Sequence, residues 1–310
     1  MKAIKLFLLA IITYSSSILN AQEFTELTGD YLGQTPPGDT PVVFAPGIVS
    51  TREHQHSAPA FAADGKEVYW SVIRESNDSV YQQIMSMEFI NGKWNEPHPA
   101  SFSVKNSYEG GPVISGGGNK LYIYRGKAAP PGGRADTIKI ICYTKQNNKW
   151  VNPETISDGV FHSVADNGTI YFITTPQSGI QKRVFKNGSY SEPELLNQEI
   201  NLPGSMNWTP FIAPDESYLI FSRLYEGGDY GNLFISFYDT VNDEWKDTIK
   251  LDDVINTSSQ ERFPTITSEG KYLFFNRNIS DMNDDIFWVN AGIINKLKEK
   301  VLEILLKTDD

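Results

Sequence analysis

The chain has 310 residues and a net charge of −11, which argues against nucleic acid or an anionic membrane surface as its partner. Hydrophobic residues make up 40% of the chain and aromatic residues 12%, which is sufficient material for a large core. Cys142 is the only cysteine, so no internal disulfide can replace core burial as a source of stability.

The first 21 residues have the three-part pattern of a secretory signal peptide. Lys2 and Lys5 form a short basic start, an apolar run covers residues 6–12, and small and polar residues lead to Ala21. The apolar run is too short to cross about 30 Å of hydrocarbon as a permanent anchor. We therefore predict cleavage after Ala21, export to the periplasm or beyond, no membrane insertion afterwards, and an N-terminal extension over residues 22–39.

Five related segments follow, and each is typical of two short strands joined by an Asp-Gly-type turn. They cover residues 58–71, 111–124, 161–173, 209–222 and 263–276. A third strand follows four of them, over residues 81–89, 138–143, 181–185 and 232–238. A tight turn carrying an aromatic residue then leads into a fourth strand; these aromatic residues are Trp94, Trp150, Tyr190 and Trp245. Four antiparallel strands in each repeat predict the blades of a β-propeller.

The two ends of the repeat region complement each other. The fifth repeat has three recognisable strands and lacks a fourth, whereas residues 40–46 look like a fourth strand without a blade. Pairing of these two ends would remove two exposed sheet edges. The sequence therefore predicts an all-β chain with a five-bladed propeller over residues 40–292, closed by its N-terminal strand; six blades are the alternative.

Two elements of these repeats resemble a known family. Residues 61–69 read Phe-x-x-Asp-Gly-Lys-x-x-Tyr, and residues 214–223 read Pro-Asp-x-x-x-Leu-x-Phe-Ser-Arg. Both are similar to the WD40-like repeats of TolB-type propellers, and the resemblance covers residues 40–292. It implies a propeller that serves as a binding scaffold or as an accessory domain of an enzyme, more often with six blades than five.

The C-terminal tail over residues 293–310 has apolar residues at helical spacing, with lysines and glutamates between them. We expect a helix that packs on the propeller, with a partner-binding helix as the alternative.

Counting from the repeat turns predicts which side chains face one another where the first two strands of a blade meet. Glu109 should face Arg125, Asn207 should face Arg223, and Glu261 should face Arg277, all near one mouth of the central channel. The predicted ligand-binding residues at this mouth are His56, Glu109, Arg125, Asn207, Trp208, Arg223, Glu261 and Arg277. The alternative is that each pair only ties two strand ends together.

These residues favour a non-catalytic binding module for a carbohydrate, a peptide or a protein. The first alternative is a glycan-active hydrolase or lyase that uses Glu109 and Glu261, assisted by His56. Against it, the neighbouring arginines should lower the pKa of both carboxyl groups, whereas a general acid needs a raised pKa. The second alternative is a structural module for protein assembly.

No metal or cofactor is predicted. His54 and His56 lie on one face of an extended segment, but no third ligand accompanies them. Residues 281–285 begin like a calcium loop without its glycine, and we interpret them as a solvated acidic loop.

Overall fold

The computed structural model describes residues 26–299 except 77, 116, 132, 134, 136, 176, 226–230 and 281–282. The predicted signal peptide (residues 1–21) and the tail from residue 300 therefore lie outside the described residues. The regular structure of the described chain is nearly all β-strand, which confirms the all-β prediction. Within this part of the chain, no helix has the length and hydropathy needed to cross a bilayer.

The five repeats begin five antiparallel units, which we number in chain order. Unit 1 contains β2 (His54–Gln55), β3 (Ala60–Phe61), β4 (Glu67–Glu75), β5 (Val80–Ile90), β6 (Lys93–Trp94) and β7 (His98–Pro99). Unit 2 contains β8 (Ser107–Ser115), β9 (Lys120–Lys127), β10 (Lys139–Gln146) and β11 (Lys149–Asp158). Unit 3 contains β12 (Val160–Val164), β13 (Ile170–Ile173), β14 (Gln181–Arg183), β15 (Phe185–Lys186), β16 (Ser189–Tyr190) and β17 (Glu194–Leu195).

The remaining strands form the last two units. Unit 4 contains β18 (Ser205–Ile212), β19 (Tyr218–Tyr225), β20 (Asn232–Asp239), β21 (Glu244–Trp245) and β22 (Ile249–Lys250). Unit 5 contains β23 (Glu261–Ile266), β24 (Tyr272–Ser280) and β25 (Asn283–Asn290), and β1 (Val42–Val43) completes it in the order β1-β25-β24-β23. All pairs within a unit are antiparallel, and one parallel contact, Gln82 with Tyr108, joins the sheets of units 1 and 2.

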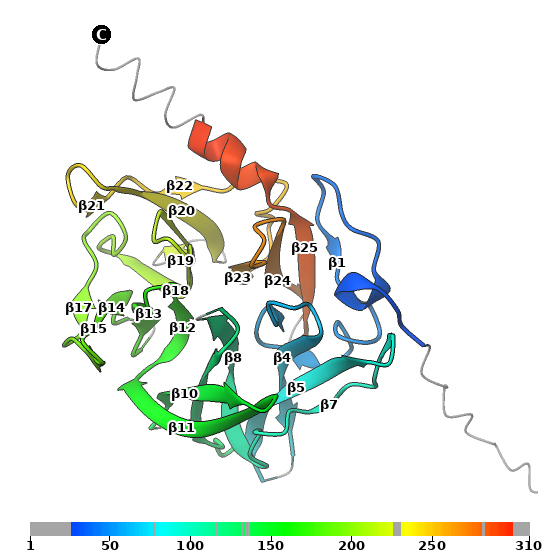
Figure 1. The fold of residues 1–310 in the computed structure, drawn as a ribbon. Helices are drawn as coiled ribbons and strands as arrows, with labels where there is room; N and C mark the ends of the chain where they lie inside the picture. The colour runs from blue at the N-terminus through cyan, green and yellow to red at the C-terminus, as the bar shows by residue number, and fades with distance from the viewer. Residues whose placement is uncertain are drawn as a thin grey trace, which may run out of the picture.

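The units are arranged around a common centre (Figure 1). The first strand of each unit lies innermost, and we call these segments (β2–β3, β8, β12, β18 and β23) the inner strands. Side chains from all five inner strands line a single cavity, so the strands share one axis. The fold is thus propeller-like, and the apolar faces of neighbouring units pack against each other as the core.

The aromatic turns at the outer edge have the backbone that the sequence predicts. Asn91 and Gly92 both have positive φ (53° and 86°), the geometry of the two-residue hairpin turn that Asn-Gly favours. Each following aromatic side chain packs inward: Trp94 is 2% exposed, and its Nε1 donates to the carbonyl of Gly29. The turns therefore anchor the outer strands as well as reversing the chain.

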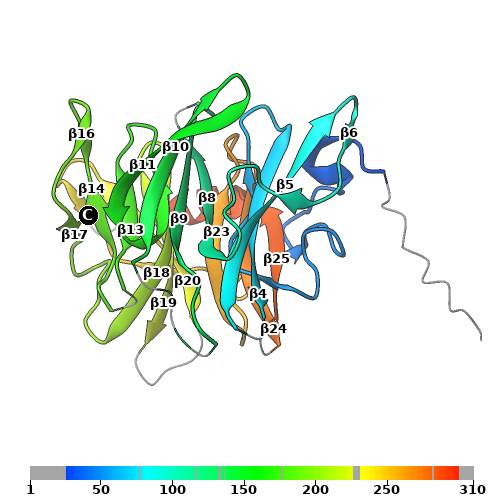
Figure 2. The same cartoon turned by 90° about the horizontal axis from the view of Figure 1, so that it is seen from below.

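The N-terminal segment connects unit 1 to unit 5. Val42 pairs with Trp288 in an antiparallel register, so the predicted pairing of this segment with the last unit is observed. Phe44 is fully buried against Phe274 and Trp288, with ring centroids 5.1 and 5.2 Å away. A short 3-10 helix, η1 (Asp30–Gly33), lies before β1 and buries Leu32 completely. Figures 1 and 2 show this blue segment running beside β5 and β25.

Residues 292–299 are helical, so the helix begins one residue before the predicted tail. Ile294 is 4% exposed and packs with the apolar side chains of units 4 and 5. The described part of the tail thus packs on the propeller-like body, as the pattern predicts.

We expect Phe44→Ala to lower the free energy of unfolding by about 3–5 kcal/mol, because it leaves a cavity between the N-terminal segment and unit 5. Urea denaturation followed by tryptophan fluorescence measures this loss. Val42→Ala is the control, since Val42 lies in the same segment and is 43% exposed. Equal effects of the two substitutions would contradict a structural role for the Phe44 contact.

Candidate functional site

The structure confirms the predicted register of the three polar pairs. Glu109 lies opposite Arg125, Asn207 opposite Arg223, and Glu261 opposite Arg277. The three arginine Nε atoms lie 2.8, 2.9 and 3.0 Å from oxygens of Glu109, Asn207 and Glu261, respectively.

Each arginine also holds the loop that leads into its inner strand. Arg125 donates to the carbonyl of Phe102 at 2.9 Å, and Arg277 donates to that of Ile255 at 2.8 Å. Arg223 donates to the carbonyls of Glu199 and Ile200 at 3.0 and 2.8 Å. Since the same contacts recur in three units, the geometry is that of a structural clamp on the connection between units.

The two carboxylates are enclosed by these clamps. Glu109 and Glu261 are both fully buried, and the backbone N–H of Val104 donates to Glu109. Burial raises the pKa of Glu261, although Thr257 and Arg277 act to lower it. The expected lowering by arginine was therefore wrong for Glu261, because loss of solvation outweighs the ion pair. A role for these pairs in ligand binding stays a prediction.

His56 and Trp208 lie closer to the axis. His56 is 7% exposed, and its ring centroid lies 4.9 Å from that of Phe263 and 5.8 Å from that of Phe161. Burial and the positive charges of neighbouring groups hold the pKa of His56 well below its usual value, so the ring is neutral at pH 7. Trp208 is half-buried, and its indole N–H has no hydrogen-bond partner within the described part of the chain.

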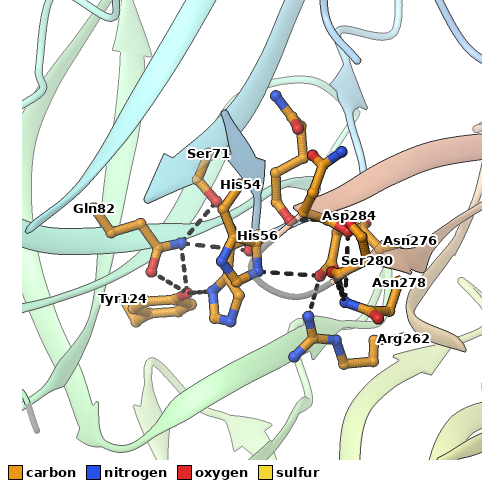
Figure 3. Close-up of polar contacts among 12 residues, drawn as sticks. His54, His56, Ser71, Gln82, Tyr124, Arg262, Asn276, Asn278, Ser280 and Asp284 are labelled. Carbon is orange, nitrogen blue, oxygen red and sulfur yellow. Dashed lines mark hydrogen bonds and ion pairs between the residues drawn. The ribbon is translucent and has the colours of Figure 1, made fainter. Parts of the chain in front are cut away.

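A second polar cluster, which the sequence did not predict, lies at the seam where unit 5 meets unit 1. Asp284 is the second residue of β25, and its buried carboxylate contacts His54 of β2, Arg262 of β23 and Asn278 of β24 (Figure 3). Asp284 Oδ2 lies 3.2 Å from His54 Nε2, and Asn278 Nδ2 donates to Oδ1 at 2.8 Å. We call these four residues the seam cluster.

The cluster stabilises an ionised carboxylate without solvent. Burial alone would raise the pKa of Asp284, but hydrogen bonds from His54 and Asn278 and the charge of Arg262 hold it well below its usual value. Asp284 was interpreted from sequence as part of a solvated acidic loop, and this is wrong because its side chain is fully buried. Residues 281–282 of that segment lie outside the described residues.

Two nitrogen atoms of the seam cluster have hydrogen-bonding capacity that the described residues leave unused. With Nε2 of His54 donating to Asp284, Nδ1 carries the lone pair, and it is buried without a partner among the described residues. Arg262 Nε is likewise buried without a partner there. The His54 and Arg262 side chains are 16% and 13% exposed, so the cluster reaches solvent. A histidine oriented by a carboxylate, next to a cation, can act as a general base.

No group of three or more metal-ligating side chains occurs in the described portion of the chain. His54 and His56 lie with ring centroids 5.5 Å apart; His54 contacts Asp284, whereas His56 Nδ1 lies 3.5 Å from the hydroxyl of Tyr124.

A large cavity lies elsewhere on the axis, toward the C-terminal ends of the inner strands, whereas His54 and Arg262 of the seam cluster lie at their N-terminal ends. The two features are separated by Phe161 and Phe263, whose rings meet edge to face at 5.3 Å.

Comparisons with known proteins identify the fold and no family. No protein-family model matches the sequence, and no curated protein does. A GH43_1 enzyme from Xanthomonas citri, solved with xylotriose, is similar over 79% of this chain and 88% of its own, with 12% identity and a TM-score of 0.51. A GH43 β-xylosidase/α-arabinofuranosidase from a compost metagenome is similar over 81% of this chain and 94% of its own length, with 14% identity and a TM-score of 0.47. Regucalcin, a calcium-binding protein from Agrobacterium tumefaciens, covers 82% and 93%, with 10% identity and a TM-score of 0.48.

The chain therefore has a propeller-like fold. This comparison also corrects the expectation of a non-catalytic binding module. The expectation depended on the fold being a binding scaffold, whereas the structure with a TM-score of 0.51 is an enzyme.

We expect Arg277→Met to destabilise the protein by about 3–5 kcal/mol, because it leaves the buried carboxylate of Glu261 without its cation. Adding Glu261→Gln to Arg277→Met should recover most of this loss, since the buried charge is then removed as well. Chemical denaturation of the two single variants and the double variant measures the coupling. Strictly additive effects would contradict the clamp.

A second prediction concerns His162, which is buried and has a pKa of about 4 in the folded protein because burial disfavours its charged form. In the unfolded chain its pKa is about 6.5. As pH falls, His162 therefore takes up a proton in the unfolded state before it does so in the folded state. Between pH 6.5 and 4 this difference lowers the free energy of unfolding by about 3 kcal/mol. The free energy of unfolding should fall over this window, and His162→Leu should flatten the decline. An unchanged slope in the variant would contradict this assignment.

Proposed function

We propose that this protein is a glycan-active hydrolase whose reactive groups are the seam cluster. The observation that carries the proposal is the buried Asp284 carboxylate, which bonds Nε2 of His54 and also contacts Arg262, while His54 Nδ1 has no partner among the described residues. Such an arrangement of base, orienting acid and cation has a use in catalysis that a purely structural ion pair does not need.

In the proposed reaction, the substrate bond is an ester on an acylated glycan. Nδ1 of His54 accepts a proton from a water molecule as that water attacks the acyl carbon, and the imidazolium returns the proton to the departing sugar oxygen as the ester C–O bond breaks. Asp284 stabilises the imidazolium that forms, as the carboxylate does in other histidine–aspartate pairs. Arg262 Nε donates toward the oxygen on which negative charge develops. His56 remains neutral and bounds the site on the side of the axis.

The glycan substrate class is supported by the fold similarity to the GH43_1 enzyme solved with xylotriose, and by the aromatic side chains near the axis. Tyr108 is the neighbour of Glu109 in β8, and Trp208 is the neighbour of Asn207 in β18. Because adjacent side chains in a strand point to opposite faces, both aromatic side chains lie on the faces opposite the clamps. Aromatic faces next to polar groups are typical of carbohydrate sites.

The same proposal includes the finer architecture and the compartment. The five units would be five blades of a closed ring of WD40-like repeats, with β1 as the closing strand, supported by its pairing with β25. Residues 1–21 would direct the protein to the periplasm or beyond, where extracellular glycans are available as substrates.

The test is hydrolysis of xylan, arabinan and their acetylated forms by the mature protein, with release of reducing sugar and of acetate measured separately. We expect His54→Gln to lower kcat/KM by at least about 100-fold, the usual contribution of a general base. His98→Gln is the matched control, because His98 also bonds a carboxylate, Glu88, at 2.8 Å but lies on the outer strands.

Circular dichroism and melting temperature verify that both variants fold. No release of either product from any substrate, or equal activity of His54→Gln and the unmodified protein, would refute the proposed function.

A further inference from the structure

The cavity at the other end of the axis has the size of a small-molecule site. It has a volume of about 550 Å³ and is lined by all five inner strands, including residues 58–61, 111–115 and 263–268. Small-molecule sites typically measure about 300–1,000 Å³. The seam cluster contributes none of the lining residues, so the cavity is a separate feature of the fold.

Four inner strands carry the same unusual backbone where they enter the cavity wall. Gly111, Phe161, Thr209 and Phe263 have φ of 57°, 50°, 45° and 51°. At each of them the pairing register with the second strand shifts, which marks a β-bulge. Left-handed conformations are costly for Phe and for β-branched Thr, and strain of this kind concentrates at binding and catalytic sites.

Each bulge places a defined residue against the cavity. In unit 2 only glycine is tolerated, because a Cβ at Gly111 would lie 2.9 Å from the ring of Tyr124. In unit 3 the residue after the bulge is His162, whereas the other three units have a proline there. His162 breaks the repeat and is the one imidazole in the described wall of the cavity.

His162 offers hydrogen-bonding capacity that the protein does not use. The side chain is 5% exposed, and neither ring nitrogen makes a well-formed hydrogen bond within the described part of the chain. A buried polar group without a partner costs free energy, which a bound ligand would recover.

Buried hydroxyl groups add unused donors to the same wall. Ser163 Oγ accepts the backbone N–H of Ile212 at 3.0 Å, and Thr209 Oγ1 accepts that of Phe263 at 3.1 Å. Among the described residues, neither hydroxyl hydrogen has an acceptor, so both remain available to ligand oxygens.

The charge of the wall selects the ligand. Asp166 is the only charged side chain among the described lining residues, and it is exposed at the rim. Burial keeps His162 neutral, with a pKa of about 4. An anion would find no counter-charge here, and the apolar wall would penalise a buried cation.

We propose that this cavity is a second site that binds an uncharged, polyhydroxylated ring compound, a neutral saccharide. The unused donors of His162, Ser163 and Thr209 match its oxygens, and the rings of Phe161 and Phe263 form an apolar floor for its C–H face. The site lies across that aromatic floor from the seam cluster, so its occupancy does not depend on the proposed hydrolysis.

Isothermal titration of the mature protein at pH 7 with xylobiose, cellobiose and lactose tests the proposal, with digalacturonate and chitosan dimer as charged comparisons. We expect at least one neutral disaccharide to bind and neither charged dimer to do so. His162→Leu should weaken that binding by about tenfold, the loss of one or two hydrogen bonds. His54→Gln should bind the disaccharide unchanged, although it should lose hydrolytic activity.

Ala63→Trp provides a test that does not alter the core. Ala63 is exposed at the cavity rim, and a bulky side chain there should block entry and abolish binding. Val241→Trp, at a position that is 89% exposed and outside the cavity lining, is the matched control and should bind normally. Absence of binding at millimolar disaccharide, preference for a charged dimer, or full binding by both His162→Leu and Ala63→Trp would overturn the proposal.

Discussion

The rest of the structure depends on the seam between the first and last units. At its outer side, the N-terminal strand pairs with β25 and buries Phe44, so the last unit is completed by the opposite end of the chain. At its inner side, Asp284 is held as a buried anion by His54 and Arg262, whose strands come from units 1 and 5. Removing either partner would leave a buried charge uncompensated, so the two ends of the chain are joined by packing and by electrostatics together.

Three of the four remaining connections between units use a repeated solution. An arginine at the end of the second strand bonds an acid or amide of the inner strand and the carbonyls of the preceding loop. One planar guanidinium satisfies several buried acceptors at once, which lysine could not do with the same geometry. In the structure these residues hold the loops that lead into the inner strands, and their role in ligand binding stays a prediction.

The two ends of the axis differ in chemistry although the same five strands form both. The N-terminal ends of the inner strands carry the ionised seam cluster, and the C-terminal ends enclose a neutral cavity lined by aromatic rings and hydroxyl groups. Phe161 and Phe263 separate them, each held in a left-handed backbone conformation by its bulge. Two left-handed positions, Phe161 and Phe263, thus divide the axis into a charged end and an uncharged end.

The sequence by itself determined the repeats, the strand order within each unit, the Asn-Gly turns and the facing of Glu109 with Arg125. All of these depend on contacts between residues close in sequence, which follow from turn chemistry and the two-residue period of a strand. Only the tertiary structure decided the seam cluster, because His54 and Asp284 are 230 residues apart and their pairing requires the first and last units to meet. The same holds for Glu261. The sequence predicted that Arg277 lies opposite it, but whether its pKa is raised or lowered depends on how completely neighbouring units exclude water.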